Sequence, residues 1–69
     1  MEKQIDIDAR RIGNEIVFGS LETANEIWKQ VIKNLKRWEV IALRVKIEAV
    51  TNELDAAKAD IEVKKNPSV

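Results

Sequence analysis

The side chains of this 69-residue chain that could do chemistry are carboxylates and amines, because the sequence contains neither histidine nor cysteine. That composition excludes thiolate catalysis, a histidine general base and the common zinc sites. The two serines are Ser20, a candidate helix cap, and Ser68, so no set of nucleophile, base and orienting group can be assembled. Gly13 and Gly19 stand apart and form no phosphate-binding loop. We therefore expect no enzyme activity, no catalytic residue and no cofactor.

One pair of acids has the spacing of a possible cation site. Asp6 and Asp8 would point the same way from a β-strand, and Glu15 could add a third oxygen ligand for calcium or magnesium. No Asp-x-Asp-x-Asp-Gly loop accompanies them, and the charged outer face of a strand explains the pair equally well. We predict no metal ligand here.

A basic cluster is the most distinctive charged feature. Four cations occur within nine residues with no acid between them, and beside them stands an aromatic side chain: Lys29, Lys33, Lys36 and Arg37, followed by Trp38. Cations are favourable at a helix C-terminus, so dipole complementation explains them without a phosphate ligand. Twelve basic and twelve acidic residues also cancel over the chain, which gives no general attraction to nucleic acid. These five residues are therefore predicted partner-binding residues, with a protein favoured over nucleic acid. A nucleic-acid-binding regulator that also uses Arg10 and Arg11 remains an alternative.

The element that should carry this cluster is an amphipathic helix between Leu21 and Arg37. Its apolar residues recur every three or four positions: Leu21, Ala24, Ile27, Trp28, Val31, Ile32 and Leu35. Ser20 or Thr23 can cap its N-terminus, and Thr23 and Glu26 have the spacing of a capping box.

After Trp38 the pattern becomes an alternation of apolar and charged residues, and a second alternation follows between Ala57 and Lys64. A hairpin around residues 52–54 would pair Arg44 with Glu62 and place the apolar residues on one face. The competing interpretation is a long helix over residues 39–64, because the apolar residues of this segment also follow a heptad. We favour the hairpin, since β-branched residues are frequent between residues 40 and 51.

Gly13-Asn14 is a hairpin-turn dipeptide, and it suggests a first hairpin in which Ile5, Ile7 and Ala9 share a face. The predicted fold is therefore α+β, a ββαββ two-layer domain with one helix packed on a mostly antiparallel sheet. The alternative is an all-α helical hairpin or coiled coil. Residues 1–65 should form a single small domain, and residues 66–69 a flexible tail.

The tryptophans complete the set of candidate residues. Trp28 lies within the apolar stripe of the helix and should belong to the core, whereas Trp38 should pack a corner or stack on a planar ligand. Ser20-Leu21-Glu22, Trp38-Glu39-Val40 and Ile47-Glu48 look faintly similar to the corresponding segments of dodecins, small β-α-β-β flavin-binding shells. The resemblance covers half of the chain and lacks the family's last-turn glycine and terminal aromatic. It implies flavin stacking on Trp38, which makes a small-ligand-binding oligomer a further alternative.

Our expectation for function is a non-catalytic protein-interaction module of the adaptor or inhibitor type, with a regulatory role. A chain this short usually needs disulfides, a metal or a partner subunit for stability, and of these a partner remains. It should act as a homo-oligomer through sheet edges or the basic helix end. The charged N-terminus and the short apolar runs predict a cytoplasmic protein that does not enter a membrane.

Overall fold

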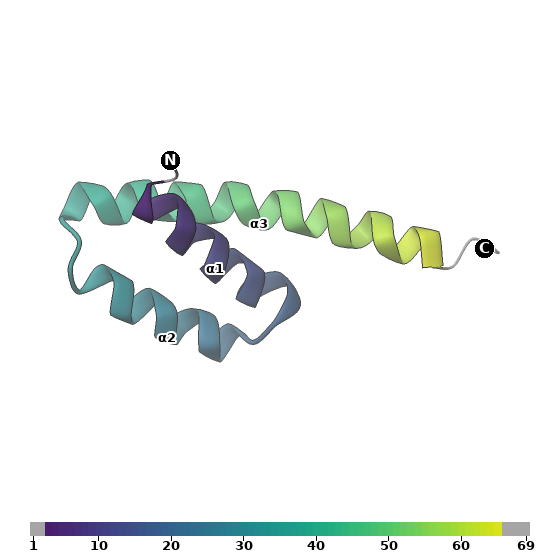
Figure 1. Cartoon of the computed structure of the whole chain (residues 1–69), viewed down its shortest axis with the longest axis horizontal. Coiled ribbons are helices and arrows are strands. Elements are labelled where there is room, and N and C mark those ends of the chain that lie inside the picture. The colour runs from purple at the N-terminus through teal and green to yellow at the C-terminus, as the bar shows by residue number, and fades with distance from the viewer. Residues whose placement is uncertain (1–2, 66–69) are drawn as a thin grey trace.

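The structure, a computed structural model, describes residues 3–65, with side chains through Glu62. This part of the chain forms three helices, α1 (Gln4–Phe18), α2 (Leu21–Ile32) and α3 (Arg37–Lys65) (Figure 1). Helices α1 and α2 lie on one side of α3, whose C-terminal part extends beyond them. No strand occurs between residues 3 and 65, so the predicted α+β fold with its ββαββ sheet is wrong and the fold is all-α. The predicted tail at residues 66–69 lies outside the described residues.

Helix α1 replaces the predicted first hairpin. Its buried apolar residues, Ala9, Ile12 and Val17, have helical spacing, whereas Ile7 is 38% exposed despite its predicted place beside Ala9. Gly13 is not a turn residue but a point of close approach to α3. A Cβ atom at Gly13 would lie 2.8 Å from Cγ1 of Val50, so only glycine allows the two helices this separation.

Helix α2 confirms that the predicted amphipathic helix begins at Leu21, but it ends at Ile32 and not at Arg37. The Ser20 hydroxyl accepts a hydrogen bond from the backbone N–H of Glu22 at 3.1 Å, which makes Ser20 the N-cap. The helix ends at Ile32, and a turn begins at Lys33. The residues up to Arg37, which the periodicity assigned to the same helix, therefore form the connection to α3.

Helix α3 runs unbroken through the predicted second hairpin, as the heptad alternative proposed. It begins after Lys36, whose backbone N–H donates to the Glu39 carboxylate at 3.0 Å, one half of a capping box. In a helix, Arg44 and Glu62 are separated by about 27 Å along the axis, so they cannot form the predicted cross-strand pair. Val50 and Leu54 of α3 instead lie beside Gly13 of α1, and Leu43 is fully buried.

Helix α1 is the centre of the fold, because it packs against both α2 and α3 while these two scarcely touch each other. Two polar contacts fix α3 along α1. Lys46 forms an ion pair with Asp6 at 2.7 Å, and the Lys58 ammonium donates to the backbone carbonyl of Val17 at 3.2 Å, near the end of α1. Helices α2 and α3 therefore have few contacts with each other, and a gap remains between them.

Candidate protein-binding groove

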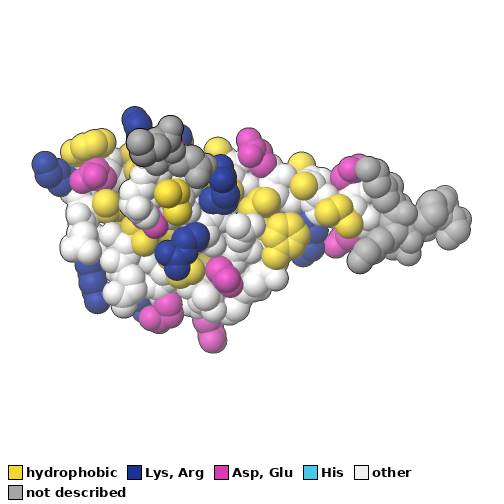
Figure 2. Space-filling model, viewed as in Figure 1, with side chains coloured by type: hydrophobic (Ala, Val, Ile, Leu, Met, Phe, Trp, Pro, Cys, Tyr) yellow, Lys and Arg dark blue, Asp and Glu magenta, His cyan; other side chains and the backbone are white. Residues whose placement is uncertain are grey.

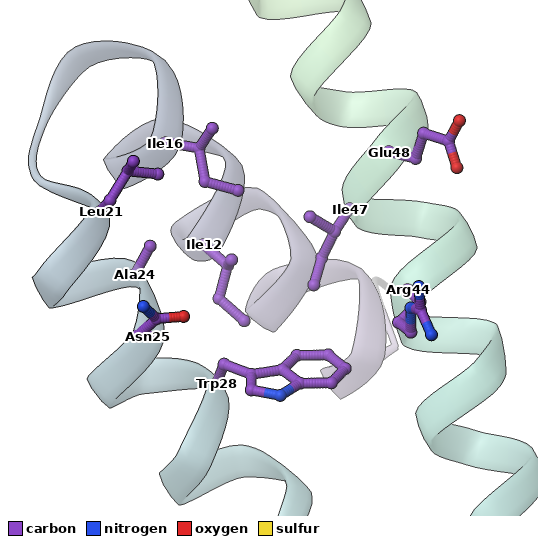
Figure 3. A pocket seen from close by; sticks show the side chains of 9 residues that line it. All are labelled: Ile12, Ile16, Leu21, Ala24, Asn25, Trp28, Arg44, Ile47 and Glu48. Atoms are coloured by element: carbon purple, nitrogen blue, oxygen red, sulfur yellow. The ribbon is translucent and has the colours of Figure 1, made fainter.

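The gap between α2 and α3 is an open groove with a volume of about 540 Å³, and α1 forms its floor (Figure 3). We refer to it as the α2–α3 groove. Its lining comes from all three helices: Ile12 and Ile16 from α1, Leu21, Ala24, Asn25 and Trp28 from α2, and Arg44, Ile47 and Glu48 from α3. Most of these side chains are apolar, and the polar ones come from α2 and α3. A concave apolar surface of this size with few polar groups is typical of a binding site.

The side chains lie in the groove because each helix turns its apolar stripe inward. Trp28 extends from α2 toward α3, and Ile47 extends from α3 toward α2, with Ile12 behind them (Figure 3). Ala24 is only 4% exposed, because its small side chain brings α2 close to α1. Trp28 is partly exposed, so the predicted core tryptophan is instead part of the groove wall.

The two ends of the groove differ in charge. Arg44 and Trp28 lie at the end nearest the connection between α2 and α3, and the basic cluster begins at Lys29 on that side. Glu48 follows Arg44 by one turn of α3, about 6 Å along the axis, and its carboxylate points away from α2 (Figure 3). At the other end, the first turn of α2 carries the exposed carboxylate of Glu22, which does not line the groove. The charge that an extended ligand meets in the groove is therefore that of Arg44, at the end beside the connection.

The predicted basic residues do not line the groove. Lys29 forms an exposed ion pair with Glu26 at 4.0 Å, and Lys33, Lys36 and Arg37 are exposed in and beside the connection. Figure 2 shows basic side chains at this end of the molecule. The helix dipole explanation applies to Lys29, which is the basic residue in the last turn of α2. Lys36 and Arg37 lie at the N-terminal end of α3, where the dipole is unfavourable to cations, so dipole complementation does not account for them.

Trp38 is 66% exposed in the first turn of α3. The prediction that it packs a corner of the fold is therefore wrong. Trp38 lines neither the α2–α3 groove nor a second hollow, which lies between α1 and α3. The β-α-β-β order that the dodecin resemblance implied is also absent from residues 3–65, so the structure gives Trp38 no flavin site of that kind.

A second hollow lies between α1 and α3 on the other side of the molecule and is lined by Asp6, Ala9, Arg10, Lys46, Ala49, Val50 and Glu53. Its volume is about 310 Å³. The hydrogen bond from Lys46 lowers the pKa of Asp6 below its ordinary value. Asp8 is buried and accepts a hydrogen bond from the Gln4 amide at 3.1 Å, so the two acids have separate partners, Lys46 on α3 for Asp6 and Gln4 on α1 for Asp8. No group of three histidine, cysteine or acidic side chains within residues 3–62 is placed to hold a metal ion.

The prediction missed Ile12 and Ile16, which form the floor of the groove, because it assigned α1 to a hairpin. A signal for them was present. Ile5, Ala9, Ile12 and Ile16 are spaced by four, three and four residues, which is the period of a helix. The Gly13-Asn14 dipeptide, which is typical of a hairpin turn, instead led to the prediction of two strands.

Comparisons with other proteins give no relative on which to base a function, since no family model, curated protein or solved structure matches the chain significantly. None of the helices in the described part of the chain combines the length and the apolar character needed to cross a membrane. The geometry of the groove is therefore the basis for a functional proposal.

Proposed function

We propose that this chain is a non-catalytic protein-interaction module that binds an amphipathic helix of a partner protein in the α2–α3 groove. The observation that carries the proposal is the apolar groove itself, which is bounded by two helices that scarcely contact each other. A fourth helix between α2 and α3 would complete a four-helix bundle, the arrangement in which such faces are normally buried. The helix-in-groove mode needs apolar anchors at i, i+3 or i+4, and i+7 on the partner.

The charges of the groove specify the chemistry of that helix. One end carries Arg44 and lies beside the basic connection. A helix whose acidic side chains are concentrated near one end complements this end of the groove. We infer that the acidic end of the partner helix lies beside Trp28.

Photo-crosslinking tests this proposal. Asn25 is exposed and lines the groove, so we would replace it by a photoreactive phenylalanine derivative. Thr23 is the matched control, because it is an exposed residue of the same helix that does not line the groove. In the host cell, the probe at residue 25 should capture a helical segment of one partner, and the probe at residue 23 should not. Equal capture at both positions would contradict the proposal.

The captured segment is then made as a peptide and titrated against the protein. A Trp38→Phe variant leaves Trp28 as the sole tryptophan, so the emission reports on the groove wall alone. We expect the peptide to shift the emission of Trp28 to shorter wavelength, and a Leu21→Glu substitution in the groove to abolish binding. An unchanged spectrum on saturation with the peptide would exclude the α2–α3 groove as its site.

A further inference from the structure

The α3 wall of the groove continues beyond the groove lining toward the start of the helix. Arg44 and Glu48 line the groove, and Arg37 and Ile41 precede Arg44 by seven and three residues on the same helix. Residues at these spacings share one face of a helix, so the four side chains form one stripe. Arg37 is exposed, and Ile41 is 59% exposed. We call Arg37 and Ile41, the part of this stripe outside the groove lining, the wall extension.

The two arginines of the stripe have no anion of the fold beside them. Between residues 3 and 62, no ion pair includes Arg37 or Arg44. Glu39 is the acid nearest to Arg37 in sequence, and its carboxylate accepts the backbone N–H of Lys36 instead. Arg37 also lies at the N-terminal end of α3, where the helix dipole disfavours a cation. An anion from outside the chain would offset this unfavourable placement.

The wall extension determines how long a helix in the groove must be to reach Arg37. On α2 the groove lining runs from Leu21 to Trp28, about 10 Å along the helix axis. Arg37 lies about 10 Å beyond Arg44 along α3, on the side of the connection. A helix that fills the groove and also reaches Arg37 is therefore about 20 Å long, which requires about 14 residues or four turns.

We propose that the partner helix carries two carboxylates, two helical turns apart, which bind Arg44 and Arg37 along the wall extension. This inference rests on the proposed function, because it concerns the same helix in the same groove. Helices that pack at a small angle keep facing each other over two turns, so acids at this spacing meet both arginines. Each guanidinium offers two parallel N–H donors to a carboxylate, and an apolar side chain between the two acids can pack on Ile41.

Synthetic peptides test the inference before the natural partner is known. The probe is a helical peptide of about 18 residues, with three apolar anchors in one half and two glutamates, two turns apart, in the other. One control peptide has glutamine in place of both glutamates, and a second has one glutamate moved to the opposite face of the helix. Binding is measured from the emission of Trp28 in the Trp38→Phe protein. We expect the probe to bind about tenfold more tightly than the glutamine peptide and about threefold more tightly than the second control.

Arg37→Gln in the same protein isolates the residue that lies outside the groove lining. It should weaken binding of the glutamate probe about threefold and binding of the glutamine peptide less, because the second peptide has no carboxylate to lose. Arg11→Gln is the matched control, since Arg11 is an exposed arginine of α1 that does not line the groove. It should leave the affinity for both peptides unchanged.

Thermal unfolding separates a binding role of Arg37 from a structural one. Arg37→Gln removes a cation from the N-terminal end of α3, so Tm should stay the same or rise. A lower Tm, together with an equal loss of affinity for both peptides, would assign Arg37 to the fold and overturn the inference.

The peptide results also distinguish this inference from the proposed function. If the glutamate and glutamine peptides bind equally well, the groove accepts a helix but the arginines do not select its acids, and the inference alone fails. If none of the peptides changes the emission of Trp28, the groove does not accept a helix, and the proposed function fails together with the inference.

Discussion

Replacing Gly13 by alanine tests the packing of α1 on α3 at its closest point. The new Cβ atom would lie 2.8 Å from Cγ1 of Val50 and 3.7 Å from Cδ1 of Leu54. Val50 is β-branched and has one strongly preferred rotamer in a helix, so the methyl group cannot rotate away and the helices must separate. Such overpacking costs about 1–3 kcal/mol.

The opposing effect is the higher helix propensity of alanine, about 0.8–1 kcal/mol in a helix interior. The full gain in helix propensity applies, because Gly13 lies within α1 and its φ is not positive. Alanine therefore adopts the same backbone conformation without strain. We expect the overpacking to prevail because Val50 is stiff, with a net loss of up to about 2 kcal/mol in the free energy of unfolding. For a domain of this size that lowers Tm by up to roughly 16 °C.

Urea and thermal unfolding followed by circular dichroism measure this loss, with all variants at the same protein concentration. Val50→Ala removes the colliding methyl group and provides the control. In the Gly13→Ala/Val50→Ala double variant the new methyl group occupies the vacated space, so we expect a favourable coupling of at least about 1 kcal/mol. If Gly13→Ala stabilises the protein by the propensity term alone, or if the two changes are additive, the close approach is refuted.

Three further predictions concern the rest of the fold. Leu43→Ala should cost about 2–5 kcal/mol in unfolding free energy, because Leu43 is fully buried and its loss leaves a cavity; a loss under about 1 kcal/mol would contradict that burial. Ser20→Ala should cost about 1 kcal/mol in the same assay, whereas Thr23→Ala should cost much less, because Ser20 is the residue that caps α2. By NMR titration, Lys46→Met should raise the pKa of Asp6 toward its ordinary value, since the hydrogen bond from Lys46 lowers it. The stabilisation from this pair is present above the pKa of unfolded aspartate and is lost as the pH falls through the lowered folded value. An Asp6 pKa that does not respond to Lys46→Met would exclude the contact.

The candidate site was predictable in part. The α2 wall of the groove follows from the spacing of Leu21, Ala24 and Trp28, which a helical period of three and four residues places on one face. The floor and the opposite wall were missed, because both belong to segments that were assigned to hairpins. The basic residues were expected to mark the partner surface, and they lie beside the groove end instead of within it.

The sequence alone determined what depends on composition and on near neighbours along the chain. The lack of histidine and cysteine excludes whole classes of chemistry, and Ser20 begins a helix by bonding a backbone group two residues away. Such features need no distant partner, so local physical chemistry suffices to predict them.

Only the tertiary structure decided between strand and helix elsewhere. From residue 40 onward, alternation and heptad were both present, and strand propensities differ by only about 1 kcal/mol and depend on the surroundings. Packing against α1 resolves the ambiguity, because a continuous helix buries Leu43 completely and places Lys58 against the end of α1, 41 residues away in sequence. The role of Gly13 also depends on tertiary structure, because a side chain at this position would collide only with Val50 of the distant helix α3. These contacts join residues far apart in the chain, and their free energy outweighs the small local preferences that favoured strands.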